Sequence, residues 1–201
     1  MKDMHIKITF TEPLLGTASA DPSIHETFIA SKAPDALSRE EEVAVYGVEE
    51  VNERATTIFP RLDDGSPFLW DYQVKGYLKD ACSMLRRVPG TKSNKLAAHK
   101  KVIDGLIFPE PRKIKLVLPD GYGNELETCE RPLRASTAQG DRVALACSEM
   151  CPAGTTIEFR VKLFKDSLAP TVKEWFDYGA FRGIGQWRNS GMGRFEVEYL
   201  D

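Results

Sequence analysis

The order of strand-like and helix-like segments constrains the fold of this chain most. Apolar and polar side chains alternate in several segments, which predicts half-buried strands, and in two others apolar residues recur at helical spacing. The predicted strands cover residues 5–10, 113–118, 142–147, 156–164 and 195–200, and the predicted helices cover 72–86 and the segment that follows Pro170. This order favours an α+β fold with a ferredoxin-like βαββαβ core that carries insertions.

Two stretches fall outside this pattern. Residues 13–67 have weak periodicity and include an acidic segment at 35–53, and an unstructured loop of that length is unusual in a folded domain. Residues 88–115 are rich in lysine and arginine, and within them residues 95–103 predict a short basic helix. We therefore expect one domain over 1–201, with an excursion at about 13–67 and a basic insertion at about 88–115.

The overall charge does not by itself indicate a nucleic-acid binder. The chain has 27 basic and 30 acidic residues and a net charge of −3, whereas freestanding nucleic-acid-binding domains are usually basic. The basic middle and the acidic early segment indicate either two contact surfaces or two solvated faces. The sequence has no apolar stretch of the length that a membrane span needs, so we expect a cytoplasmic protein without a membrane partner.

Residues 181–195 form a glycine- and arginine-rich segment that contains four glycines, three arginines and no acidic residue. Glycine lets the backbone adopt positive φ and approach a ligand, and the arginine guanidinium matches phosphate oxygens. The segment therefore predicts a loop that contacts a phosphate backbone, although a solvated loop that closes a sheet would look similar. Trp187 within it is equally suited to stack on a base or to anchor the core.

Lys75 and Lys79 lie one helical turn apart in the first predicted helix and so share a face. Gly76 stands between them and costs about 1 kcal/mol of helix stability relative to alanine. Close approach of a ligand or of another chain would explain that cost; a tolerated glycine on an ordinary amphipathic helix is the alternative.

Three segments together resemble a known family. Residues 67–79 carry a proline-containing approach to a Lys-Gly pair at a helix start, residues 148–155 read Ser-Glu-Met-Cys-Pro-Ala-Gly-Thr before a strand, and residues 181–195 form the closing glycine-rich loop. In this order they resemble the RAMP superfamily of CRISPR-associated proteins. Within it the chain is most like the backbone subunits of CRISPR effector complexes, which coat guide RNA.

This resemblance implies a ferredoxin-like fold similar to an RNA-recognition motif, with single-stranded guide RNA and other effector subunits or further copies of the chain as partners. We expect no cofactor. Cys129, Cys147 and Cys151 could in principle hold zinc, but their spacing differs from the usual zinc knuckle and no histidine lies near them, so we expect reduced thiols and no metal. The positions that the resemblance assigns to RNA binding lie on the helix and in the loop: Lys75, Gly76, Lys79, Arg182, Gly183, Gly185, Trp187, Arg188, Gly191, Gly193 and Arg194.

Catalysis is a weaker expectation. Some RAMP backbone subunits cleave bound target RNA with an acidic residue in the excursion after the first strand, and Asp21 and Asp35 lie in the comparable region. His25 in the same region could act as a general acid or base. No positioned partner for it is visible in the sequence.

Three functions remain open at this point. The leading one is a non-catalytic RNA-binding subunit of RAMP type. The second is a stand-alone or virus-encoded relative that interacts with CRISPR effector subunits or mimics them, and the third is a RAMP-type endoribonuclease.

Overall fold

The computed structural model describes residues 1–19, 56–123, 125–137 and 140–200. The chain forms two compact units. The first comprises Met1–Leu14, Pro60–Glu125 and Cys151–Asp201, and the second comprises Leu15–Phe59 and Leu126–Met150. The short strand β2 (Leu14–Leu15) lies where the chain passes from one unit to the other.

The first unit is built on an antiparallel sheet. Its strands follow the order β11-β1-β10-β7-β5, and β6 pairs with the part of β10 that β7 leaves free. The strands are β1 (Lys2–Phe10), β5 (Phe68–Trp70), β6 (Ile107–Glu110), β7 (Lys113–Val117), β10 (Thr156–Leu163) and β11 (Phe195–Tyr199). The strands predicted at 5–10, 113–118, 156–164 and 195–200 are therefore confirmed.

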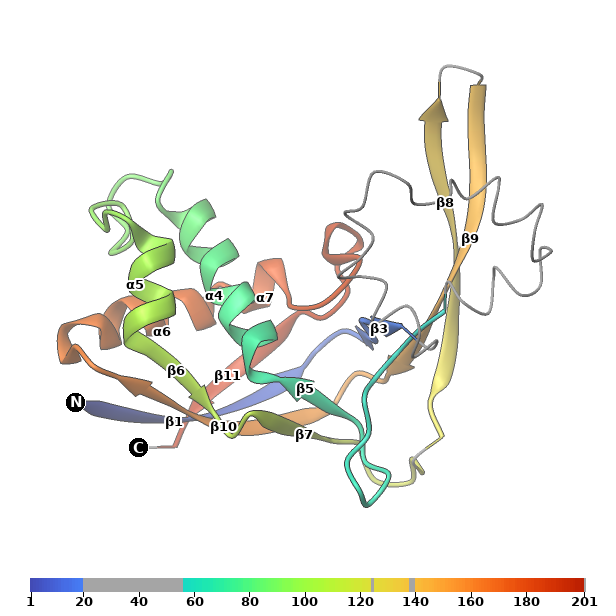
Figure 1. Ribbon diagram of the computed structural model, residues 1–201, viewed down its shortest axis with the longest axis horizontal. Coiled ribbons are helices and arrows are strands. Elements are labelled where there is room, and N and C mark those ends of the chain that lie inside the picture. The colour runs from blue at the N-terminus through green and yellow to red at the C-terminus, as the bar shows by residue number, and fades with distance from the viewer. Residues whose placement is uncertain (20–55, 124, 138–139, 201) are drawn as a thin grey trace, which may run out of the picture. The chain divides into compact units, whose positions relative to one another are not determined.

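Helices cover one face of this sheet, as Figure 1 shows. They are α4 (Asp71–Leu85), α5 (His99–Leu106), α6 (Ala169–Asp177) and α7 (Gly179–Arg182), with the short 3-10 turns η1 (Asp166–Leu168) and η2 (Arg188–Ser190). Ile6 and Ile8 of β1 and Phe159 of β10 are buried beneath them. The buried Tyr77 hydroxyl of α4 donates a hydrogen bond of 2.6 Å to the backbone oxygen of Trp175 in α6, which fixes the two helices to each other.

The segment between α4 and α5 is held by α6. The Glu174 carboxylate accepts hydrogen bonds from the backbone nitrogens of Lys92 and Ser93, at 2.8 and 3.2 Å, and from the Ser93 hydroxyl at 2.8 Å. The indole nitrogen of Trp175 donates to the same hydroxyl at 2.7 Å. Ser93 is fully buried, so this part of the basic segment is anchored in the core. The helix predicted at 95–103 begins later than expected, at His99.

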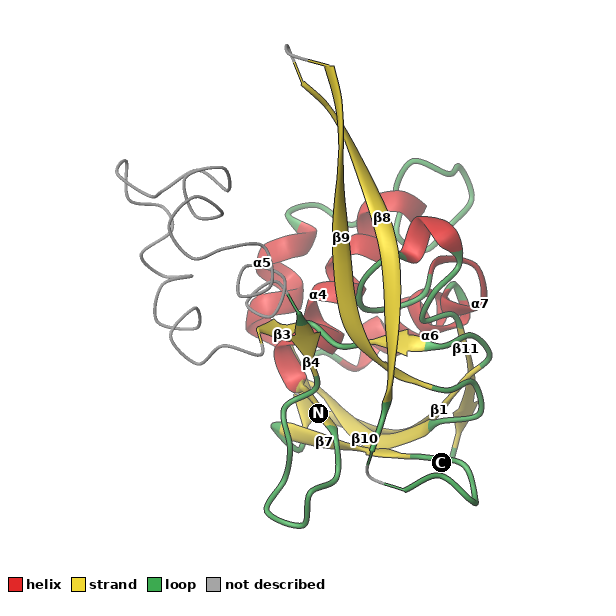
Figure 2. Cartoon of the chain, turned by 90° about the vertical axis from the view of Figure 1, so that its right-hand side faces the viewer, coloured by secondary structure: helices red, strands yellow, loops and turns green. Residues whose placement is uncertain are grey.

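The second unit contains a long antiparallel ribbon of β8 (Glu127–Thr137) and β9 (Gly140–Cys151), drawn in Figure 2. Beside it, β4 (Thr57–Ile58) pairs in parallel with β9 and antiparallel with β3 (Ala18–Ser19). Glu149 ties these strands together, because its carboxylate accepts from the Phe59 nitrogen at 2.7 Å and its backbone oxygen from the Gly16 nitrogen at 2.8 Å. The strand predicted at 142–147 thus belongs to a longer strand, and β8 was not predicted.

The protein has an α+β fold with mainly antiparallel sheets, and the α+β class is the one that the sequence predicted. Within the described part of the chain, none of the helices has both the length and the apolar character that crossing a lipid bilayer requires.

Candidate nucleic-acid interface

The exposed face of α4 is centred on Gly76. Val74, Tyr77, Leu78 and Ala81 are buried on the opposite side of the helix. Tyr72, Gly76 and Asp80 follow one another at spacings of four residues, so they form one row along the outer face. Apart from the neighbouring residues and the backbone of α4 itself, no heavy atom would lie within 4 Å of a Cβ atom added at Gly76. The protein therefore leaves this face open.

On one side of Gly76 the two lysines of the helix lie toward α5. The Nζ atom of Lys79 is 2.6 Å from Oδ1 of Asp104, and the Nζ atom of Lys75 donates to the backbone oxygen of Asp104 at 3.0 Å. Lys75 also lies 4.2 Å from the centre of the Phe108 ring. Burial is the main reason that the pKa of Lys75 is lowered, and the charge of Asp104 opposes this shift.

On the other side of Gly76 two arginines of the glycine-rich loop meet Asp80. The Nε atom of Arg182 and the Nη1 atom of Arg188 lie 2.8 and 2.7 Å from Oδ2 of Asp80. Arg182 also donates to the side-chain oxygen of Asn189 at 3.2 Å. Partial burial acts to raise the pKa of the Asp80 carboxyl, but the hydrogen bonds and charges of the two arginines outweigh it and lower that pKa.

Within the glycine-rich loop, the backbone at Gly183 and Ile184 passes close to the backbone at Met192 and Gly193. Gly183 and Gly193 have φ angles of 72° and 69°, and the Ile184 nitrogen donates to the Gly193 oxygen at 2.9 Å. A Cβ atom at Gly183 would lie 2.6 Å from the Met192 oxygen, and one at Gly193 would collide with the Ile184 oxygen. The packing of the loop on itself is thus sufficient reason for glycine at these two positions.

The rest of the loop is more exposed. Gly185 and Gly191 have φ angles of 87° and 90°, and Trp187 between them also has a positive φ of 54°. Trp187 is 38% exposed, so it does not anchor the core. The Arg194 side chain is exposed and lies over Gly191, where an added Cβ atom would be 3.6 Å from its Cζ atom.

The structure brings four of the predicted residues together around α4, two from the helix and two from the loop segment. Lys75 and Lys79 border the Gly76 face on the α5 side, and Arg182 and Arg188 border it on the loop side. All four cations contact Asp80 or Asp104, through a carboxylate or a backbone oxygen. We call these four side chains, Lys75, Lys79, Arg182 and Arg188, the cationic frame. Asp80 and Asp104 are the acidic residues that they contact.

Sequence reasoning missed a group of residues at the start of α4. The rings of Trp70 and Tyr72 stack there, and Arg112 and Lys113 lie near the Trp70 ring. Both aromatic residues stand inside the segment 67–79 that carried the resemblance, and both cations stand in the basic segment. Their proximity depends on the pairing of β5 with β7, which the sequence pattern did not predict.

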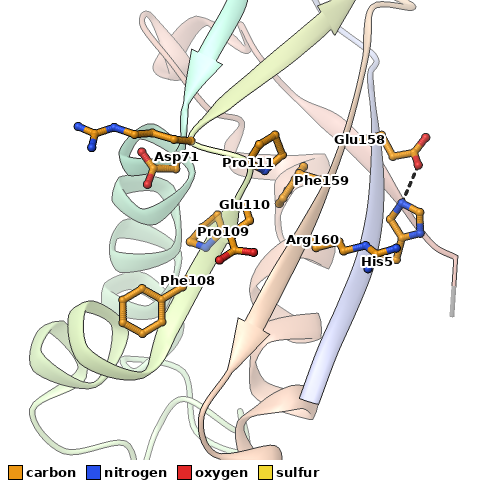
Figure 3. A pocket seen from close by; sticks show the side chains of 10 residues that line it. His5, Asp71, Phe108, Pro109, Glu110, Pro111, Glu158, Phe159 and Arg160 are labelled. Atoms are coloured by element: carbon orange, nitrogen blue, oxygen red, sulfur yellow. Dashed lines mark hydrogen bonds and ion pairs between the residues drawn. The ribbon is translucent and has the colours of Figure 1, made fainter. Parts of the chain in front are cut away.

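A hollow of about 770 Å³ opens where β6 ends and β7 begins (Figure 3). Its lining combines three carboxylates with three basic side chains: His5, Asp71, Glu110, Arg112, Glu158 and Arg160. Glu158 pairs with His5 at 2.6 Å, and Glu110 pairs with Lys162 at 2.7 Å. With both signs of charge and internal pairs, this hollow does not favour a polyanion.

The catalytic candidates Asp21, His25 and Asp35 lie outside the described residues. Of the other histidines, His5 forms the pair with Glu158, and His99 lies 2.9 Å from both the Ser83 hydroxyl and Nη1 of Arg86. Because arginine can only donate, His99 accepts at Nδ1 and carries its proton at Nε2 toward Ser83. It therefore cannot act as a base on that hydroxyl. Burial and then the Arg86 charge lower the pKa of His99.

Among the described residues, no group of three or more histidine, cysteine, aspartate or glutamate side chains is placed to hold a metal ion. Cys82, Cys129, Cys147 and Cys151 do not form disulfides, and burial is the main reason that the pKa of Cys82 is raised to about 11.

Comparison with known proteins gives matches at the level of structure. No family model matches the sequence, and no curated protein matches it. A chain in the cryo-EM structure of the Type III-B Cmr-beta complex bound to cognate target RNA matches all of this chain, with a TM-score of 0.54 and 11% identity. The present chain covers 61% of that chain, so it spans less than two thirds of its length.

A chain of a Type IV-B CRISPR complex matches 99% of this chain with a TM-score of 0.51 and 12% identity, and 90% of that chain is covered. Both similar structures are therefore components of CRISPR complexes, which is the class of protein that the three sequence motifs indicated. At the level of its fold, this chain is similar to chains of CRISPR complexes, and the predicted resemblance to CRISPR-associated proteins is confirmed at that level.

Proposed function

We propose that this chain is a RAMP-type RNA-binding subunit of a CRISPR effector complex, which holds single-stranded guide RNA by its backbone and assembles with like subunits. The observation that carries the proposal is the open face of α4 at Gly76 with Lys75 and Lys79 on one side and Arg182 and Arg188 on the other. Cations spaced along an unobstructed helix face suit a chain of phosphates.

The internal ion pairs of this frame are compatible with RNA binding. Lys79 and Asp104 have side chains that are 32% and 53% exposed, and exposed pairs of this kind are worth about 0–1 kcal/mol. A phosphate can therefore replace the carboxylate at little cost. Arg188 uses only Nη1 for Asp80 among the contacts of described residues, which leaves other guanidinium donors for a ligand.

We infer further that the first unit has a ferredoxin-like βαββαβ core. The order β11-β1-β10-β6 in the sheet supports this, since α4 connects β1 to β6 along the chain and α6 connects β10 to β11. The single-domain organisation, with an excursion at about 13–67 and a basic insertion at about 88–115, stays a proposal beside it.

Measured affinity for labelled single-stranded RNA as a function of salt tests the proposal. Replacing Lys75, Lys79 and Arg188 by glutamine should reduce the slope of log K against log salt by about 2, because each phosphate contact on a single strand contributes about 0.7. The matched control replaces Lys7, Arg160 and Lys162 by glutamine, since these side chains lie on the face of β1 and β10 that the helices do not cover and none of them is a proposed RNA contact.

Equal salt slopes for the two triple variants would contradict the proposal.

Purification of the protein from cells distinguishes the proposed RNA-binding subunit from the main alternative, an interaction module or mimic. An interaction module or mimic would bring down effector subunits without RNA, whereas the proposed subunit should bring down RNA that raises its absorbance ratio. An endoribonuclease would shorten the labelled RNA during the same binding measurement, and His25→Ala should then prevent the cleavage.

A further inference from the structure

The start of α4 presents a stacked pair of aromatic rings. The Trp70 and Tyr72 rings have centroids 6.1 Å apart and planes inclined by 16°. Trp70 is supported by Phe68, whose ring meets it edge-on at 4.9 Å, and the Trp70 backbone nitrogen donates to the side-chain oxygen of Gln73 at 2.7 Å. Tyr72 is 55% exposed. The Trp70 ring is thus supported by the protein, and the Tyr72 ring is the solvent-exposed member of the pair.

Two cations accompany the pair. The guanidinium carbon of Arg112 lies 5.7 Å from the centre of the Trp70 ring, and Nζ of Lys113 lies 5.9 Å from it. Neither side chain forms an ion pair with a carboxylate among the described residues. By contrast, Lys115, the next outward-facing residue of β7, is paired with Asp64 at 2.7 Å. One carboxylate lies beside the aromatic pair, that of Asp71, and its Oδ1 atom accepts from the Tyr72 backbone nitrogen at 2.9 Å. The two cations therefore outnumber this single carboxylate and are not ion-paired with it.

The position of Tyr72 connects this cluster to the open face of α4. Tyr72 precedes Gly76 by four residues and so stands next to it on the same helix face. A strand that lies along the face at Gly76 would reach the Tyr72 ring at the helix start. Exposed aromatic rings next to cations are a common means of holding single-stranded nucleic acid, because every base has a π face to stack and a phosphate nearby.

We propose that the Trp70–Tyr72 pair is a stacking site for one unpaired base of single-stranded RNA, with Arg112 and Lys113 contacting the adjoining phosphates. The base stacks on the outer face of Tyr72. This inference rests on the proposed function for the identity of the ligand, but it assigns a base contact in addition to the backbone contacts.

Tyr72→Leu and Tyr72→Phe in the full-length chain test the assignment. Leucine removes the ring at an exposed position and phenylalanine keeps it, so the pair separates stacking from the hydroxyl group. With short single-stranded RNA, Tyr72→Leu should weaken binding about 5- to 100-fold and Tyr72→Phe should bind like the unaltered protein. Arg112→Gln with Lys113→Gln should weaken binding and lower the salt slope by about 1.4.

A second measurement uses the unaltered protein. RNA that contains 2-aminopurine should lose fluorescence on binding when that base stacks on Tyr72, and the loss should disappear with Tyr72→Leu. Suppose that the unaltered chain and Tyr72→Leu bind RNA with the same affinity and the same salt dependence, and that no 2-aminopurine position is quenched. This result would overturn the stacking site and leave the proposed function intact. Absence of any RNA binding by the unaltered chain would overturn both. Loss of effector-subunit capture by Tyr72→Leu with unchanged RNA affinity would assign the ring to a protein contact and overturn the proposal.

Discussion

Arg182 and Asp80 are 102 positions apart in the sequence, yet the Nε atom of the arginine lies 2.8 Å from Oδ2 of the aspartate. Arg188 reaches the same oxygen at 2.7 Å. One carboxylate on the exposed side of α4 therefore fixes both ends of the turn that carries Trp187. The glycine-rich loop owes its position beside the helix to this contact.

We expect Asp80→Asn to destabilise the protein by about 1–2 kcal/mol, because two arginines lose a charged hydrogen-bond acceptor while a neutral oxygen remains. Chemical denaturation in urea measures the change. Asp166→Asn is a suitable control, since among the described residues the Asp166 carboxylate pairs only with the exposed amino terminus, at 3.0 Å. Equal unfolding midpoints for the two variants would show that the Asp80 contacts add nothing to stability.

The same carboxyl should make part of the stability depend on pH. The two arginines lower the pKa of folded Asp80 below that of the unfolded chain, so the unfolded state binds more protons as the pH falls. The stabilisation is complete above the unfolded pKa of about 3.9 and is lost progressively below it. The unaltered protein should therefore have a higher urea midpoint than Asp80→Asn at about pH 6, and this difference should be smaller at about pH 3. A larger difference at about pH 3 than at about pH 6 would contradict the lowered pKa of Asp80.

The periodicity of apolar residues correctly predicted the strands and helices that form the core of the first unit. It did not predict two strands that contain a proline. The alternation in β1 and β10 and the helical spacing in α4 follow directly from which side chains are buried. Pro132 lies within β8 and Pro109 within β6, and proline lowers the likelihood that a segment is read as a strand. The α5 helix starts late because Ala98 before it adopts a left-handed conformation, with φ of 48°.

For the candidate site, the sequence predicted side chains that share a helix face but not their partners across the fold. Lys75, Gly76 and Lys79 follow from helical spacing alone. The contacts of Asp80 with the loop, and of Trp70 with Lys113, join segments that are distant in the sequence, so no local pattern contains them. The sequence also suggested ligand approach as the reason for the loop glycines, whereas backbone packing is sufficient reason at Gly183 and Gly193.

Two glycines should respond in opposite ways to alanine. At Gly193 the added Cβ atom would collide with the Ile184 oxygen and φ is 69°, so we expect a loss of about 2–3 kcal/mol. At Gly76 the space is open and the backbone is helical, so alanine should stabilise the protein by about 0.5–1 kcal/mol. Urea unfolding of both variants measures this. Destabilisation by Gly76→Ala would mean that the face at Gly76 is not open in the folded protein.

The buried hydroxyl of Ser93 should contribute strongly to the anchoring of the basic segment. Ser93→Ala leaves the Trp175 indole nitrogen without its 2.7 Å acceptor and the Glu174 carboxylate without one of three donors. An unsatisfied buried group of this kind costs about 1–3 kcal/mol. Hydrogen exchange at the amides of Lys92 and Ser93 should accelerate together with this loss. Ser190→Ala, in the exposed turn η2, is the control, and equal exchange in both variants would exclude the anchor.

Asp104 should act as an internal competitor of RNA phosphate for Lys79. Asp104→Asn removes the 2.6 Å pair, and because that pair is exposed the variant should lose no more than about 1 kcal/mol of stability. RNA affinity should rise about two- to fivefold at low salt and approach that of the unaltered protein as screening increases. The matched control is Asp166→Asn, which removes an exposed pair with the amino terminus at 3.0 Å. If Asp166→Asn raised RNA affinity as much as Asp104→Asn, the effect would reflect net charge alone and Lys79 would not be a phosphate contact.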